Sequence, residues 1–213
     1  MLSLLIPLQP LIQEIVAGIV TLFVILDPIG VLPFFLKLTI GLSQDERKKL
    51  ANKAVVVAMG LLLVFAFLGD GILLFLGIQI ADFEIAGGAL LLIFALRDAL
   101  SNEPLGVTES SEAINTSQIV QSLAIIPIST PLLAGPGSLT TVMLLTRENY
   151  GILISTVAIL VDCAIAWLFF RISGRINKLL GPTVLLIIGK VLDVLMAAIA
   201  VSFLTSGVLA IFG

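Results

Sequence analysis

Long apolar stretches alternate with short polar segments along the whole of this chain. The apolar stretches cover Ile15–Leu38, Ala54–Leu76, Phe83–Leu100, Ile119–Leu145, Ile152–Phe170 and Val184–Ile211. Each is close to the ~20 apolar residues that an α-helix needs to cross a bilayer. The pattern therefore predicts an all-α integral membrane protein with six transmembrane helices, which form a single membrane domain over residues 1–213.

The composition supports the membrane assignment and argues against several other classes. Of the 213 residues, 59% are hydrophobic and 12% are charged, whereas about a quarter of the residues are charged in a soluble domain. Histidine, the commonest metal ligand, is absent. No basic stretch carries interleaved aromatic residues of the kind that bind nucleic acid. We expect no metal, no cofactor and no nucleic-acid partner.

Two of the apolar stretches are interrupted at their centres by proline and glycine. The first contains Asp27-Pro28-Ile29-Gly30 and the fourth contains Gly135-Pro136-Gly137. Proline removes a backbone donor and glycine weakens a helix interior, so we expect the first and fourth spans to be discontinuous. Broken backbone at membrane depth is tolerated only where protein or a water-filled cavity satisfies it. Two such spans in matching positions are typical of a transporter binding site.

The polar linker 101–117 divides the chain into two halves, a first repeat over about 1–106 and a second over about 113–213. Each half has three predicted spans, so the second repeat must be inverted relative to the first. Basic residues follow the first, third and fifth spans, and the opposite side carries only Arg147. The positive-inside rule then places those three loops in the cytoplasm and both termini outside the cell.

The broken spans suggest how a ligand is bound. A helix that starts near the bilayer midplane presents unpaired N–H groups and a partial positive charge, which favour a carboxylate. We expect such donors at residues 30–32 and 138–140, while carbonyl groups at the ends of the preceding half-helices would favour an ammonium group or a cation. A small zwitterionic amino acid fits both. The candidate binding residues are Asp27, Pro28, Ile29, Gly30, Gly135, Pro136, Gly137, Ser138, Thr140 and Thr141. The alternative is that both breaks are packing kinks.

Asp27 and Asp162 are the candidates for coupling transport to an ion, because a carboxylate inside the membrane needs a partner or a purpose. Asp27 precedes proline, so it could instead act as an N-cap that accepts from the N–H of Ile29 or Gly30. Asp162 lies in the middle of the fifth span, where it either meets Lys190 in space or joins a proton path. Both alternatives stay open for each residue.

The chain resembles the MarC family of six-span bacterial and archaeal membrane proteins, which includes the SnatA-type neutral amino acid transporters. The resemblance is carried by FVILDPIGVLPFFLKLT at Phe23–Thr39, IPISTPLLAGPGSLTTVM at Ile126–Met143 and MAAIAVSFLTSGV at Met196–Val208. It implies movement of small neutral amino acids, such as glycine or alanine, across the prokaryotic cytoplasmic (inner) membrane. Members usually have Asn-Pro where this chain has Asp27-Pro28, a difference that would permit proton coupling.

The breaks and the resemblance together favour a secondary transporter that works by alternating access and is coupled to H+ or Na+, for example as a symporter. No GxxxxGK[ST] loop is present, so we expect no ATPase in this chain. A passive channel built from half-helices is one alternative. A membrane-embedded protease, with Asp70 and either Asp162 or Asp193 sharing a proton, is another, less favoured one. We expect that the protein is not an enzyme.

Overall fold

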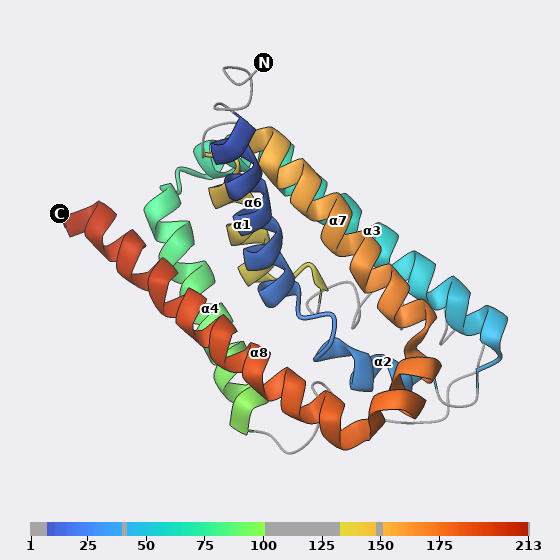
Figure 1. Ribbon diagram of the computed structural model, residues 1–213. Coiled ribbons are helices and arrows are strands. Elements are labelled where there is room, and N and C mark those ends of the chain that lie inside the picture. Colours follow the sequence, from blue (N-terminus) through green and yellow to red (C-terminus); the bar gives the residue numbers. More distant parts are fainter. Residues whose placement is uncertain (1–7, 40–41, 101–132, 148–150, 213) are drawn as a thin grey trace.

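The computed structural model describes residues 8–39, 42–100, 133–147 and 151–212, and these parts are helical with no strand (Figure 1). The helices are α1 (Leu8–Leu26), α2 (Val31–Leu38), α3 (Gln44–Leu76), α4 (Ile80–Leu100), α6 (Pro136–Leu145), α7 (Gly151–Arg171) and α8 (Ser173–Phe212). The predicted all-α class is therefore confirmed. The predicted polar linker and the first part of the fourth span lie outside the described residues.

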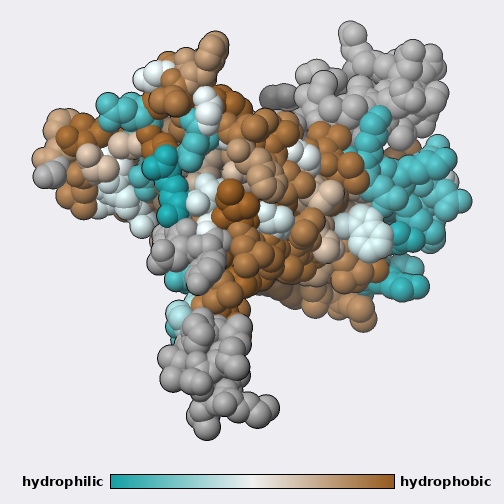
Figure 2. All heavy atoms as spheres, turned by 90° about the horizontal axis from the view of Figure 1, so that it is seen from above, coloured by the Kyte–Doolittle hydropathy of each residue, from teal (hydrophilic) through white to brown (hydrophobic). Residues whose placement is uncertain are grey.

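Three of the described helical segments are long and apolar enough to cross a membrane. They are Gln44–Leu76, Gly151–Arg171 and Thr183–Phe212, and Pro10–Leu26 and Pro136–Leu145 are shorter apolar helices. Many large apolar side chains of these helices are exposed on the outside of the molecule. Figure 2 shows a mostly hydrophobic surface, with hydrophilic residues gathered at the end where α3 begins and in a second group toward the opposite side. An exposed apolar surface of this extent suits a protein that is embedded in lipid.

The helices are arranged as two outer pairs with three shorter helices between them (Figure 1). Helix α3 packs on α7 and α4 packs on α8, and in both pairs the two helices run in opposite directions. Helices α1, α2 and α6 lie between the pairs, and α6 contacts α1, α3, α4 and α7. Each outer pair contains one helix from the first half of the chain and one from the second, so the two halves pack against each other.

Small residues let the helices approach closely. A Cβ atom at Gly88 of α4 would lie 2.9 Å from the carbonyl oxygen of Ala200 in α8. A Cβ at Gly207 of α8 would lie 2.9 Å from the carbonyl oxygen of Ala81. Such contacts between small residues are a common way to hold helices together in membranes, where burial of apolar surface provides little driving force.

Helix α8 is sharply bent near its beginning. Gly181 has φ 74° and ψ 163°, a conformation that glycine adopts easily and that divides the helix into a short piece over 173–180 and a long one over Thr183–Phe212. The short piece lies against the beginning of α3, because Gly174 and Arg175 share a cleft with Gln44 and Arg47. The basic residues that follow the first and fifth predicted spans therefore meet at one end of the molecule.

Candidate functional site

The first predicted break is present. Helix α1 ends at Leu26 and α2 begins at Val31, and Asp27 between them has φ 38°. Asp is one of the few side chains that tolerate this left-handed region, because a short polar group can hydrogen-bond to nearby backbone. Oδ1 of Asp27 accepts a hydrogen bond from the N–H of Gly30 at 2.9 Å. The predicted capping role of Asp27 is confirmed.

The expected free N–H donors at residues 30–32 are not found, and this prediction was wrong. The Gly30 N–H is taken by the Asp27 carboxylate, and the Val31 N–H donates to the Asp27 carbonyl oxygen at 3.0 Å. The Leu32 N–H donates to the carbonyl oxygen of Ile29 at 3.2 Å. The break is only one turn long, so the backbone and side chain of Asp27 reach all the way to α2. The first break is therefore closed by its own residues.

The second break has a different start. Helix α6 begins at Pro136, and the preceding Gly135 is extended, with φ −79° and ψ 173°, and provides no side-chain cap. The N–H of Leu139 donates to the carbonyl oxygen of Gly135 at 3.0 Å, so this predicted donor is occupied. Within the described part of the chain, the N–H groups of Gly137 and Ser138 have no hydrogen-bond partner. Among the described residues, the beginning of α6 thus has two donors without a partner.

The three hydroxyl groups predicted to line the site stabilise this second break. The Ser138 hydroxyl donates to the carbonyl oxygens of Leu133 and Gly135 at 2.8 and 3.0 Å. The Thr140 and Thr141 hydroxyls each donate at 2.8 Å to the carbonyl oxygen four residues earlier. All three side chains are buried. Because these hydroxyls already donate their protons within the segment, they could only accept hydrogen bonds from a ligand.

Two of the predicted glycines are packed against protein. A Cβ at Gly30 would overlap the Asp27 carboxylate, and a Cβ at Gly137 would overlap the Leu91 side chain of α4. Helix α8 also approaches the first break, since a Cβ at Gly189 would lie 3.6 Å from Cα of Gly30. In this structure Gly30 and Gly137 allow close approach of the surrounding helices and of the cap.

Helix α7 aligns Asp162 with both breaks. A Cβ at Gly18 of α1 would touch the Ile154 side chain, and the Ser155 hydroxyl donates to the carbonyl oxygen of Val142 in α6 at 3.3 Å. Along α1, eight residues lead from Gly18 to Leu26, after which the first break begins. Along α7, eight residues lead from Ile154 to Asp162. The second break lies seven residues before Val142, and Asp162 lies seven after Ser155. At 1.5 Å per residue along each helix axis, Asp162 lies about 10–12 Å along α7 from these contacts, which is a depth similar to that of the two breaks.

Asp162 is fully buried, and neither of its carboxylate oxygens has a hydrogen-bond partner within the described residues. It lies two helical turns from Ile154 and Ser155 on the same face of α7, which is the face that contacts α1 and α6. No ion pair with Lys190 is found among the described residues. A buried carboxylate inside a membrane protein that lacks a partner is a strong candidate for a functional group.

A second group of charged residues lies on the other side of the first break. The Asp193 carboxylate of α8 is 5% exposed and close enough to Asp27 for their negative charges to repel each other. Asp98 of α4 also interacts electrostatically with both. The Lys190 ammonium donates to the carbonyl oxygens of Asp98 and Ala99 at 3.3 and 2.5 Å, which helps to cap the end of α4. No cluster of three potential metal ligands occurs among the described residues.

Asp70 lies far from these buried carboxylates. It forms an ion pair with Arg147 at 3.1 Å, and both side chains are more than half exposed. This places Asp70 at the end of the molecule opposite the beginning of α3, where α3 itself ends and α7 begins. Asp162, in contrast, is fully buried. The two side chains are therefore not arranged as a pair that shares a proton.

The chain was compared with known protein families and proteins. Residues 12–212 match the model of a family described as MarC family integral membrane protein. A UPF0056 membrane protein of Methanocaldococcus jannaschii is 33% identical over 199 residues, which cover 92% of this chain and 96% of the relative. The UPF0056 membrane protein YvbG of Bacillus subtilis is 31% identical over 206 residues, with 93% and 95% covered. No solved structure matches this one. The chain therefore belongs to the MarC family of integral membrane proteins.

Proposed function

We propose that this protein is a secondary transporter of small neutral amino acids of the glycine and alanine class. The observation that carries the proposal is the buried Asp162 carboxylate, which has no partner among the described residues and is level with both helix breaks. A buried charge without a partner is costly, and a membrane protein retains it where a cationic ligand or an ion neutralises it. An ammonium group, a proton or a sodium ion would do so here.

The second break provides the complementary half of the site. The N–H groups of Gly137 and Ser138 lie at the beginning of α6, where the helix dipole adds partial positive charge. This combination favours the carboxylate of an amino acid. The ammonium group would then lie on the side of Asp162 and Asp27. A zwitterion satisfies both charges at once, and the buried apolar residues around the breaks favour a small side chain without charge.

Asp162 and Asp27 are the residues that we propose for coupling to H+ or Na+. Asp162 is the stronger candidate, because the Asp27 carboxylate is already engaged with the Gly30 N–H. Asp27 would contribute to coupling because its carboxylate is close enough to that of Asp193 for the two negative charges to repel each other. Protonation or cation binding at either residue would change the balance of charge around the two breaks and so couple ion movement to substrate binding.

We propose alternating access between two inverted three-helix repeats as the mode of transport. The antiparallel pairs α3 with α7 and α4 with α8, together with the contact of α1 with α6, each join corresponding spans of the two repeats. The polypeptide would cross the bilayer six times, with the basic end in the cytoplasm and both termini outside. Rocking of one repeat against the other would open the site to each side in turn.

Uptake of labelled glycine into proteoliposomes tests this function. Competing amino acids define the substrate class, and imposed proton or sodium gradients identify the coupling ion. We expect gradient-driven accumulation that unlabelled alanine inhibits and that larger charged amino acids do not. Preloading with unlabelled glycine should accelerate uptake of the label by counterflow, which a passive pore would not do. Absence of uptake under every gradient, by protein that is correctly folded and inserted, would contradict the proposal.

A further inference from the structure

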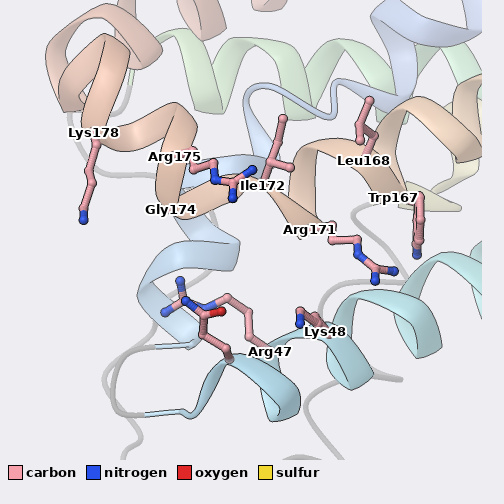
Figure 3. Close-up of a pocket in the computed structure, with 10 residues that line it drawn as sticks. Arg47, Lys48, Trp167, Leu168, Arg171, Ile172, Gly174, Arg175 and Lys178 are labelled. Atoms are coloured by element: carbon pink, nitrogen blue, oxygen red, sulfur yellow. The ribbon is translucent and has the colours of Figure 1, made fainter.

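A basic cleft of about 700 Å³ lies at the end of the molecule where α3 begins, at a distance from the two helix breaks. The start of α3, the end of α7 and the short first piece of α8 form its walls. Five of its lining side chains are cationic, and no lining residue from the described part of the chain is acidic. They are Arg47, Lys48, Arg171, Arg175 and Lys178. Figure 3 shows Arg47 and Lys48 on the α3 side of the cleft and the other three on the side of α7 and α8.

Few contacts neutralise these charges. Among the described residues the only ion pair of the five is between Lys48 and Asp45, at 3.6 Å on an exposed surface. Arg47 donates to the carbonyl oxygen of Thr39 at 3.3 Å, and its buried Nε has no partner within the described chain. Arg171 stacks over the Trp167 ring at 4.8 Å. Gathering five cations around one cleft is unfavourable unless an anion occupies it.

The other part of the cleft wall is apolar. Trp167, Leu168 and Ile172 line it together with the cations. Trp167 also donates from Nε1 to Oδ1 of Asn52 in α3 at 2.6 Å, which holds the indole at this position. The apolar part of α7 ends here at Arg171. Tryptophan and basic residues at the end of a transmembrane helix mark the level of the lipid headgroups.

We infer that this cleft binds the headgroup of an anionic phospholipid from the surrounding membrane. Arginine side chains bind phosphate with two parallel hydrogen bonds, and Arg47, Arg171 and Arg175 offer three such groups. The adjoining Trp167, Leu168 and Ile172 would contact the upper part of the acyl chains. A cleft of this volume is much larger than one inorganic phosphate, and its mixed polar and apolar wall fits a lipid better than a free ion. Basic clefts between transmembrane helices are suited to such lipids.

The single tryptophan of the chain makes the inference directly testable, because Trp167 lines the cleft. The protein is reconstituted into phosphatidylcholine vesicles that contain a minor fraction of either brominated phosphatidylglycerol or brominated phosphatidylcholine. Bromine quenches tryptophan fluorescence on contact. We expect the anionic lipid to quench Trp167 with an apparent affinity at least about fivefold higher than that of the zwitterionic lipid. Equal quenching by the two lipids would overturn the inference.

Matched variants locate the binding. Arg175→Gln combined with Lys178→Gln removes two charges and should reduce the preference for the anionic lipid to less than about twofold. The charge-conserving pair Arg175→Lys with Lys178→Arg should keep most of the preference, and Arg147→Gln at the opposite end should keep all of it. An unchanged preference in the glutamine variant would overturn the inference. All variants are compared at equal helical content by circular dichroism.

A further arm distinguishes the lipid from a free anion. Inorganic phosphate is added to the vesicles with phosphatidylglycerol, and chloride at the same ionic strength serves as the control. If the lipid headgroup is the occupant, phosphate should relieve the quenching no more than chloride does. Specific relief by phosphate would show that the cleft prefers a free anion, and the assignment to lipid would then be wrong.

Discussion

The two helix breaks look alike in the sequence but differ in what they present to the interior. At the first, the Asp27 carboxylate caps α2 and the N–H groups of residues 30–32 are all occupied. At the second, Gly135 has no side chain to cap α6, and the N–H groups of Gly137 and Ser138 stay bare among the described residues. The first break is therefore a closed turn, and the second is the one at which we propose that an anion binds.

This difference indicates that the two breaks have different roles. A capped turn with all of its hydrogen bonds made is suited to hold α1 and α2 at a fixed angle or to act as a hinge. A bare helix start costs free energy in a nonpolar environment unless a ligand or water completes it. Asp162, a buried carboxylate of α7 with no partner among the described residues, would supply the opposite charge. Four substitutions test this difference between the breaks, and they are given from the largest expected effect to the smallest.

Asp162→Asn should abolish gradient-driven glycine uptake, with a loss of about a hundredfold or more, because the variant removes the buried negative charge without changing the side-chain volume. The thermal stability should stay equal or rise, since an unpartnered buried charge is costly to fold around. Uptake and the unfolding temperature are measured on the same preparation. Normal uptake by the variant would remove Asp162 from the mechanism.

Gly137→Val should reduce uptake at least about tenfold, because the side chain crowds the bare N-terminus of α6. The valine side chain would also contact Leu91, so the effect on packing has to be separated from the effect on the N–H donors. Leu91→Ala is the matched change, since it makes room in α4 without touching the donors. We expect the double variant to recover the unfolding temperature and not the uptake. Recovery of both would mean that Gly137 serves packing alone.

Gly30→Ala should destabilise the protein by about 1–2 kcal/mol, because its Cβ displaces the Asp27 carboxylate from the cap. In an Asp27→Gly background the same change should cost less than ~0.5 kcal/mol, since the cap is already absent and glycine tolerates φ 38°. Asp27→Asn keeps an acceptor oxygen and should change the pH dependence of uptake more than the stability. The measurements are thermal unfolding in detergent and uptake at several pH values. Additive costs in the two backgrounds would show that the carboxylate and Gly30 are independent.

The beginning of α3 is the solvent-exposed control, and its substitution should have the smallest effect. Hydrogen bonds from the Ser43 hydroxyl and N–H hold the pKa of Glu46 below its usual range. A carboxyl group whose pKa is lower in the folded state contributes stability above its unfolded pKa and loses it as the pH falls. Ser43→Ala should therefore lower Tm by about 2 °C at neutral pH and by less in acid, with unchanged uptake. A large loss of uptake would mean that this helix start also takes part in transport.

Local rules were sufficient to predict the features that depend on neighbouring residues. Apolar length predicted the helical membrane class, and Pro28 with Gly30 predicted where the first span is interrupted. The Asp-Pro pair predicted the cap that Oδ1 of Asp27 makes to the Gly30 N–H. Each of these depends on contacts within about four residues along the chain, which is why pattern and propensity describe them.

Features that depend on the relative position of helices could not be predicted in this way. The sequence contains Asp162, but its level relative to both breaks depends on how Gly18 meets Ile154 and how Ser155 meets Val142. The bond from Lys190 to the end of α4 joins residues about ninety positions apart, so no local pattern predicts it. The basic cleft likewise collects residues from three separate segments.

The sequence by itself therefore determined that this is a helical membrane protein with an interruption at Asp27–Gly30, because hydrophobicity and backbone preference act locally. Only the tertiary structure decided that the first break is closed while two N–H groups at the second have no partner among the described residues, that a buried carboxylate lies at a similar depth, and that five cations converge at one end. The physical reason is that helix packing fixes the rotation and the relative height of each helix. A shift of one residue would turn Asp162 away by about 100° and so point it toward other neighbours.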